Sequence, residues 1–384
     1  MFNFTLENPT KIHFGKGKIA KLSTELNKEQ RILLTYGSGS IKQNGVYDQV
    51  MQALKGYQVF EFGGIEANPK FETLLKALPI IRENNIDFIL AVGGGSVIDG
   101  TKFISAAINY AGDPWELLLG DPKLKTAMPF ASILTLPATG SEMNCGAVIS
   151  KTNSPDKLVL MHELLYPRFS ILDPTTTYSL SDRQTANGIV DTFVHVTEQY
   201  ITYPVNGALQ DRFAEGILLT VIEEAAKVFL HPKDYSVRAN LMWCSTWALN
   251  DFIAKGVPQD WATHRIGHEL TARFGLDHGQ TLAIVLPSML NVKREQKHAK
   301  LLQYGERIWN IKTGTDEEKI DQAIAKTRAF FESVGVKTHL SDYGIDVSDI
   351  KDILAQLERH GLTSLGEHQD IDLKTSELIL KGCF

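Results

Sequence analysis

The first part of the chain, to about residue 180, alternates short apolar runs with amphipathic stretches. Runs rich in β-branched and aromatic residues predict strands at 31–36, 58–62, 88–92, 131–135 and 169–172. Helical periodicity between them covers 71–85 and 96–109. Strands that alternate with helices predict a doubly wound, mostly parallel sheet, which binds ligands at the carboxyl ends of its strands.

From residue 181 onward the pattern changes to longer helical stretches, at 185–200, 211–230, 237–254, 261–274 and 317–334. A turn at Leu172-Asp173-Pro174 marks the change, because proline disfavours helix in the residue before it. We therefore predict an α/β domain at 1–180 and an all-helical domain at 181–384.

Composition fits two soluble domains and excludes some partners. With 384 residues, 43% of them hydrophobic, the chain can bury large cores. A net charge of −6 without a long basic run argues against nucleic-acid binding. The scattered Cys145, Cys244 and Cys383 form no CxxC pair, as in reducing compartments. No secretion signal and no apolar run near the ~20 residues of a membrane span are present, so we expect a cytoplasmic protein.

Acidic and histidine residues recur at helical spacing in the second domain. Asp191 precedes His195 by four residues, His264 precedes His268 by four, and His278 follows in an Asp-His-Gly turn. Side chains four apart share one face of a helix, so each pair can chelate one ion. Imidazoles with a carboxylate suit Fe²⁺ or Zn²⁺ better than Mg²⁺ or Ca²⁺. These five residues predict a divalent metal site.

A glycine loop follows the strand that ends at residue 92. Gly93, Gly94 and Gly95 lead into Ser96 at the start of a helix. Glycine allows close approach of a pyrophosphate, and the helix N-terminus offers free N–H groups. The loop matches neither GxGxxG nor a P-loop. It predicts a phosphate cradle, with a plain strand-to-helix turn as the alternative.

A second loop, Gly37-Ser38-Gly39-Ser40, follows the strand at 31–36, where dinucleotide folds meet the adenosine ribose. It has no acid to take a ribose 2′-hydroxyl, and its hydroxyl groups with nearby Lys42 can bind an added phosphate. It therefore predicts NADP(H) rather than NAD(H). We expect a third segment, 135–142, which includes Thr139, to line the groove beside the nicotinamide.

Several motifs together resemble the iron-containing (type III) alcohol dehydrogenase family along nearly the whole chain. They are PTKIHFGKG, AVGGGSVIDGTK, TLPATGSE, NGIVDTFVH, GVPQDWATHRIGHEL and LDHGQTLAIVLP. The resemblance is greatest to the NADPH-dependent aldehyde reductase and butanol dehydrogenase branch. It implies an N-terminal dinucleotide-binding domain, a C-terminal helical metal-binding and catalytic domain, and an active site in the cleft between them.

The resemblance also assigns roles to individual residues. It implies four metal ligands, Asp191, His195, His264 and His278, with His268 beside the metal near the substrate. It further implies pyrophosphate contacts from Gly94, Gly95 and Ser96, nicotinamide-ribose contacts from Asp99 and Lys157, and an adenine contact from Thr135. Many relatives carry Asp in the loop that is Gly37-Ser38 here, which supports NADP(H). Many also have GTGSE where this chain has PATGSE, so that segment's role rests on its backbone.

These observations predict a metal-dependent oxidoreductase that reduces small aldehydes to primary alcohols with NADPH, reversibly. The metal would act as a Lewis acid on the carbonyl, and His268 would supply a proton or position the substrate. A metal-dependent hydrolase could use the same histidines, with the glycine loops holding a substrate phosphate. A lyase-type or polyol-oxidising relative could share the two-domain plan. We expect a homodimer with no nucleic-acid or membrane partner.

Overall fold

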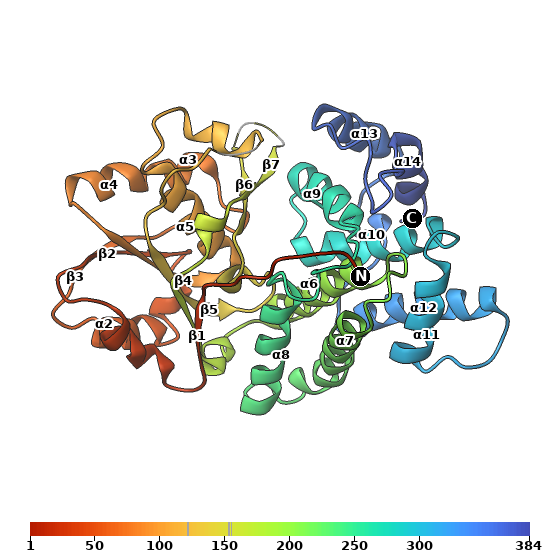
Figure 1. Ribbon diagram of the computed structural model, residues 1–384, viewed down its shortest axis with the longest axis horizontal. Helices are drawn as coiled ribbons and strands as arrows, with labels where there is room; N and C mark the ends of the chain where they lie inside the picture. Colours follow the sequence, from red (N-terminus) through yellow and green to blue (C-terminus); the bar gives the residue numbers. More distant parts are fainter. Residues whose placement is uncertain (121–122, 153, 155) are drawn as a thin grey trace. The chain divides into compact units, whose positions relative to one another are not determined.

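The structure is a computed structural model that describes residues 1–384 except 121–122, 153 and 155. The chain forms two compact units (Figure 1). The sheet unit comprises Glu7–Leu180 and Pro232–Thr246, and the helical unit comprises Met1–Leu6, Ser181–His231 and Trp247–Phe384. This division is discontinuous along the chain, whereas the predicted domains are continuous segments.

A six-stranded sheet in the order β1-β8-β5-β4-β2-β3 forms the centre of the sheet unit. All neighbouring strands in it are parallel. The strands are β1 (Lys11–Phe14), β2 (Arg31–Tyr36), β3 (Gln58–Phe62), β4 (Phe88–Gly94), β5 (Phe130–Leu136) and β8 (Phe169–Leu172). An antiparallel pair, β6 (Gly146–Ser150) and β7 (Lys157–Met161), stands apart from the sheet. The predicted parallel sheet is confirmed.

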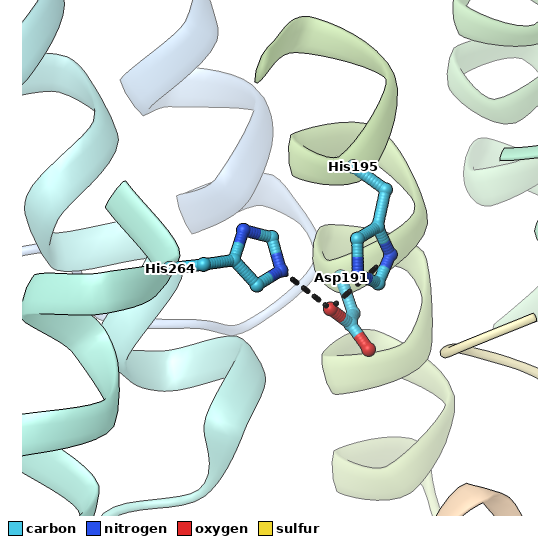
Figure 2. Close-up of side chains that lie close together, drawn as sticks. All are labelled: Asp191, His195 and His264. Carbon is cyan, nitrogen blue, oxygen red and sulfur yellow. Dashed lines mark ion pairs between the residues drawn. The ribbon is translucent and has the colours of Figure 1, made fainter. Parts of the chain in front are cut away.

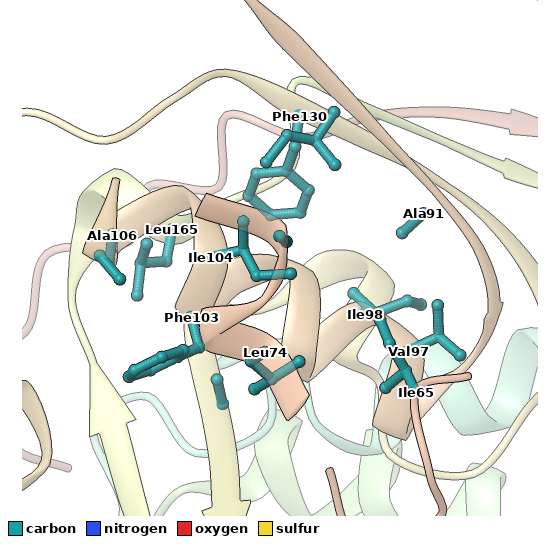
Figure 3. Packing of buried hydrophobic residues seen from close by; sticks show 14 of the residues in the cluster. Ile65, Leu74, Ala91, Val97, Ile98, Phe103, Ile104, Ala106, Phe130 and Leu165 are labelled. Carbon is teal, nitrogen blue, oxygen red and sulfur yellow. The ribbon is translucent and has the colours of Figure 1, made fainter. Parts of the chain in front are cut away.

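Each face of the sheet has its own apolar core, because successive side chains of a strand point to opposite faces. In β2, Leu33 belongs to one core and Ile32 and Leu34 to the other. The Leu33 core contains α3 (Phe71–Leu75), α4 (Ala77–Glu83) and α5 (Gly95–Ala107), and part of it is shown in Figure 3. The opposite core contains α1 (Leu22–Glu25) and α2 (Val46–Ala53). Central strands buried on both faces therefore appear as continuous apolar runs.

The winding of the chain reverses between β2 and β4. These strands are neighbours, and Tyr36 at the end of β2 is paired with Val92 of β4. The chain leaves β2 toward α2 on one face and leaves β4 toward α5 on the other. Such a reversal is where open parallel sheets bind their ligands. The loop that begins at Gly37 and the glycines that end β4 both lie at this point.

The helical unit contains no strand of a sheet among its described residues. Its helices are α6 (Asp182–Tyr200), α7 (Ala208–Val228), α9 (Ala262–Phe274), α10 (His278–Val292), α11 (His298–Trp309), α12 (Asp316–Ser333), α13 (Ile350–Arg359) and α14 (Leu373–Lys381). The predicted all-helical character of this part is confirmed. Over the described part of the chain, no helix combines the length and hydropathy required to span a bilayer.

Candidate metal centre and cofactor loops

Helix α6 carries two of the predicted ligands in its buried second half. The helix begins with a capping box in which the Ser181 side chain and Gln184 satisfy each other's backbone N–H groups. Asp191 and His195 lie one turn apart on it, and each is only 3% exposed. A carboxylate and an imidazole on one buried face need a partner to offset the cost of leaving water.

The other histidines come from α9 and from the start of α10. His264 and His268 lie one turn apart on α9, and His278 is the first residue of α10. Asn187 of α6 donates a hydrogen bond from Nδ2 to Asp277 Oδ2 at 2.7 Å, directly before His278. A Cβ added at Gly279 would lie 2.6 Å from the Asn187 carbonyl oxygen, so glycine is needed for this close approach. His278 is thereby held beside α6.

Three histidine nitrogens converge on one oxygen of Asp191. His195 Nδ1, His278 Nε2 and His264 Nε2 lie 3.5, 3.5 and 3.7 Å from Asp191 Oδ1. Figure 2 shows Asp191, His195 and His264, whose ligand atoms all lie within 4.8 Å of one another. The separations exceed ordinary hydrogen bonds. They are close to the ~3.4 Å expected between two ligands on a tetrahedral ion with bonds of about 2.1 Å, so this donor set fits Fe²⁺ or Zn²⁺.

His268 occupies a different place from the four other residues. Its ring centroid lies 5.2 Å from that of His278 and 6.3 Å from that of His264. It is buried, with 7% exposure, as are Asp191, His195 and His264, whereas the His278 side chain is 22% exposed. All five predicted residues are thus brought together, but the three nitrogens around Asp191 do not include one from His268.

A sixth residue, Glu198, contacts the cluster and was not predicted. Its Oε2 is hydrogen bonded to His264 Nδ1, on the side of the ring opposite Nε2. Burial alone would lower the pKa of His264, but the carboxylates of Glu198 and Asp191 outweigh it and raise that pKa to about 9. A divalent cation would compete for the nitrogen that binds the extra proton. Glu198 follows His195 by three residues, so helical spacing places it near His195 but does not show that it contacts His264.

The start of α9 is fixed by buried charges. Asp260 Oδ1 accepts a hydrogen bond from the Ala262 N–H at 2.8 Å. The fully buried Lys297 Nζ lies 2.7 Å from Asp260 Oδ2 and 2.6 Å from Glu367 Oε1. Trp261, between Asp260 and Ala262 in the sequence, adopts a left-handed backbone with φ +65°. Its ring centroid lies 5.3 Å from that of His264. A non-glycine residue in that region costs about 1–3 kcal/mol, which the surrounding contacts must offset.

In the sheet unit, the glycines after β4 are held close to a neighbouring loop. A Cβ at Gly95 would lie 2.4 Å from Thr139 Oγ1, so only glycine fits there. Thr135 and Thr139 lie at and just beyond the carboxyl end of β5. Gly94 and Gly95 mark the start of α5, where phosphate cradles form.

Asn68 joins two of the predicted cofactor residues and was not predicted itself. Its backbone N–H donates to Ser96 Oγ at 3.3 Å, and its Oδ1 accepts from Lys157 Nζ at 3.0 Å. The backbone of Asn68 has φ +56°, a conformation that asparagine tolerates better than most residues. Ser96 and Lys157 therefore lie close together in the sheet unit, on either side of Asn68.

Asp99 is buried within the protein's own hydrogen bonds. Its Oδ1 accepts from Ser141 Oγ at 2.5 Å and its Oδ2 from the Val148 N–H at 2.9 Å. Burial raises the pKa of Asp99, although nearby Lys102 opposes the shift. Burial also lowers the pKa of Lys102 to about 8, although the charge of Asp99 opposes the shift. The Lys102 Nζ donates to Ser141 Oγ at 2.9 Å.

The Gly37-to-Ser40 loop leads into a short turn that carries Lys42. Ser38 and Ser40 are exposed, and Gly39 has φ +100°, which favours glycine. Lys42 Nζ pairs with Glu61 Oε2 at 2.8 Å and lies 4.8 and 4.7 Å from the ring centroids of Tyr36 and Tyr47. The positive charge predicted to favour a 2′-phosphate is therefore partly neutralised by an acid.

Both halves of the chain match known protein families. Residues 9–174 match the iron-containing alcohol dehydrogenase model, and residues 185–372 match the Fe-containing alcohol dehydrogenase family, C-terminal model. The chain is 58% identical to the NADPH-dependent aldehyde reductase YqhD of Escherichia coli (strain K12), with 100% of both chains covered. It is 39% identical, also over 100% of both, to the probable NADH-dependent butanol dehydrogenase 1 of Bacillus subtilis.

A solved structure agrees with these matches. The substrate- and cofactor-free form of the aldehyde reductase YqhD from E. coli has a TM-score of 0.94 to this chain at 56% identity, with 100% of both chains covered. The chain belongs to the iron-containing alcohol dehydrogenase family. The predicted family is confirmed, and none of these relatives supports the hydrolase alternative.

Proposed function

We propose that this protein is a metal-dependent, NADPH-linked aldehyde reductase that converts small aldehydes to primary alcohols and can run in reverse. The observation that carries the proposal is the convergence of three histidine nitrogens on Asp191, in a chain 58% identical to an NADPH-dependent aldehyde reductase. A hydrolase would use the glycine loops for a substrate phosphate and would need no nicotinamide, whereas the relatives named above are NADPH- or NADH-dependent.

Asp191, His195, His264 and His278 would hold one divalent metal, Fe²⁺ or Zn²⁺. When bound, the ion supplies Lewis-acid polarisation of a carbonyl group. The chain's own contribution is to bury Asp191, His195 and His264, which keeps water scarce beside them and strengthens electrostatic interactions there. With three neutral imidazoles and one carboxylate as ligands, a divalent ion would keep a net positive charge. Stabilisation of a developing negative oxygen requires such a charge.

The sheet unit would hold NADP(H), which supplies the hydride when bound. Backbone groups of Gly94 and Gly95 with Ser96 would take the pyrophosphate at the start of α5. Lys157 would reach the nicotinamide ribose, and its bond to Asn68 would hold the ammonium group in place. We assign the remaining cofactor contacts to Asp99, Thr135, Thr139, Gly37, Ser38 and Ser40.

His268 would hold or move the proton that the alcohol product requires. Its ring centroid lies 5.2 Å from that of His278, so it is near the proposed ligands. An imidazole exchanges protons near neutral pH and is therefore suited to this step. Positioning of the substrate is the alternative role of His268.

We further propose a cytoplasmic homodimer. In the described part of the chain, Cys145, Cys244 and Cys383 form no disulfide, which is typical of reducing compartments. Two-fold dimers are the commonest assemblies of soluble enzymes. Light scattering on the purified protein would measure the mass directly, and a monomer at micromolar concentration would contradict the dimer.

The decisive experiment follows NADPH absorbance while a panel of small aldehydes is added. We expect consumption of NADPH by the metal-loaded protein, none after chelation, and recovery when Fe²⁺ or Zn²⁺ is returned in separate samples. No NADPH consumption with any aldehyde, together with metal-dependent hydrolysis of an ester, would instead support the hydrolase.

A further inference from the structure

Glu198 directs both oxygens of a fully buried carboxylate at the first turn of α9. It lies on α6, and its side chain is 0% exposed. Its Oε1 accepts a hydrogen bond from the Thr263 N–H at 2.7 Å, and its Oε2 is bonded to His264 Nδ1. The residue at the N-cap of α9, Trp261, provides no side-chain cap of its own. Glu198 therefore caps the start of α9 and holds the His264 imidazole at the same time.

We infer that Glu198 is a positioning residue that sets the tautomer of His264. A carboxylate is acceptor-only, so the imidazole nitrogen that faces it must carry a proton. In the neutral ring that proton lies on Nδ1, which leaves the lone pair on Nε2. Nε2 is the nitrogen that lies 3.7 Å from Asp191 Oδ1. The inference rests on the proposed function, in which His264 is a metal ligand.

The Glu198→Gln substitution separates this role from simple helix capping. Thr263 N–H and His264 Nδ1–H are both donors, whereas a glutamine side chain offers one acceptor and one donor group. If the amide oxygen caps Thr263, its NH₂ group faces the ring and favours the tautomer with the proton on Nε2. That nitrogen then cannot bind a metal. A capping role alone would be preserved by glutamine.

The test measures affinity for Co²⁺ by the absorption of its d–d bands and for Zn²⁺ by competition. We expect Glu198→Gln to weaken both by about 10–100-fold, as loss of a group that orients a ligand typically does. Glu198→Asp keeps the charge and should recover part of the affinity. The matched control is Glu215→Gln on α7, a buried carboxylate bonded to Tyr200 and Arg307. It should lower thermal stability without changing metal affinity.

The outcomes distinguish this inference from the proposed ligand set. Wild-type affinity and Co²⁺ spectrum in Glu198→Gln would overturn the positioning role, while loss of metal in His264→Ala would still support the ligand assignment. Retention of metal by His264→Ala would overturn that assignment itself. If Glu198→Gln fails to fold, ¹⁵N-histidine NMR of the zinc-loaded wild type decides the matter. We expect a protected Nδ1–H signal for His264, and a signal with the proton on Nε2 would overturn the inference.

Discussion

At the scale of single residues, His264 and His268 should respond differently to substitution although they lie one turn apart on α9. His264→Ala should remove most of the bound metal, because Nε2 of His264 is one of the nitrogens around Asp191. His268→Ala should keep the metal and lower kcat by about 10²–10⁴, the usual contribution of a positioned proton donor. Metal content by mass spectrometry, with steady-state rates, checks both. Full metal and full activity in both variants would refute the site.

The pair formed by Lys42 and Glu61 should tune the preference for NADP(H). Glu61 neutralises Lys42 at the end of the loop expected to meet the adenosine ribose. Glu61→Gln should therefore tighten binding of 2′,5′-ADP, and Lys42→Met should weaken it, each by about two- to fivefold because exposed pairs are weak. Binding of 5′-AMP, which lacks the 2′-phosphate, is the control in calorimetry. Equal changes for both nucleotides would contradict a role in selectivity.

The metal site could be predicted from sequence because two pairs of residues obey helical spacing and His278 follows in an Asp-His-Gly turn, while the choice of four ligands came from the family resemblance. Glu198 obeys the same spacing, but nothing in the sequence indicates that it faces α9 rather than a second ion or solvent. Asn68 carries no such signal. It reaches Ser96 and Lys157, which lie 28 and 89 residues away, only through tertiary structure. Contacts of this kind depend on how elements pack, which local patterns do not encode.

At the scale of elements, the strands were predicted well and some helices were not. The strands at 31–36, 58–62 and 169–172 have the predicted bounds. The predicted helix at 71–85 is instead two helices, α3 and α4, which meet at Lys76. Pro79 lies in the first turn of α4, where its missing N–H is tolerated, but it cannot donate to the carbonyl of residue 75 within one continuous helix.

Two further helices show where sequence patterns fail. Helix α10 was not predicted, because it is apolar on nearly all sides and contains Pro287, so it has no polar stripe. The predicted helix at 237–254 ends early, at Ala248. Asn250 Oδ1 accepts from the Phe252 N–H at 3.1 Å, and Asp251 has φ +77°, so a local turn replaces the last helical turn.

The junction of β4 and α5 gives a prediction at the same scale. Gly95→Ala should lower protein stability and NADPH affinity, because the new Cβ would lie 2.4 Å from Thr139 Oγ1 and 2.7 Å from its Cγ2. Thr139→Ala removes both atoms, so the double variant should recover stability. Thermal unfolding and NADPH fluorescence titration measure the two properties. Because Thr139 is itself a proposed cofactor contact, the affinity of the double variant is compared with that of Thr139→Ala alone. Equal affinity would mean that Gly95 serves packing against Thr139, and a lower affinity in the double variant would mean that the alanine Cβ also obstructs the cofactor.

At the scale of the whole molecule, we expect the two units to be stabilised in different ways. The sheet unit has apolar cores on both faces of its sheet. In the helical unit, α6 and α9 bring buried ionisable groups together around Asp191, and the partly exposed His278 of α10 joins them. Buried ionisable groups destabilise a fold unless they are paired. The metal is therefore expected to stabilise one unit in particular.

Hydrogen exchange with and without chelator tests this expectation. A ligand present at 100 times its Kd stabilises the state that binds it by about 2.7 kcal/mol, so exchange that requires opening of the site should speed up about 100-fold on metal removal. We expect this in the peptides around Asp191, His264 and His278, with β2, β4 and β5 unaffected. His264→Ala serves as the control and should not respond to chelator. Equal acceleration in both units would mean that the metal stabilises the molecule as one cooperative body.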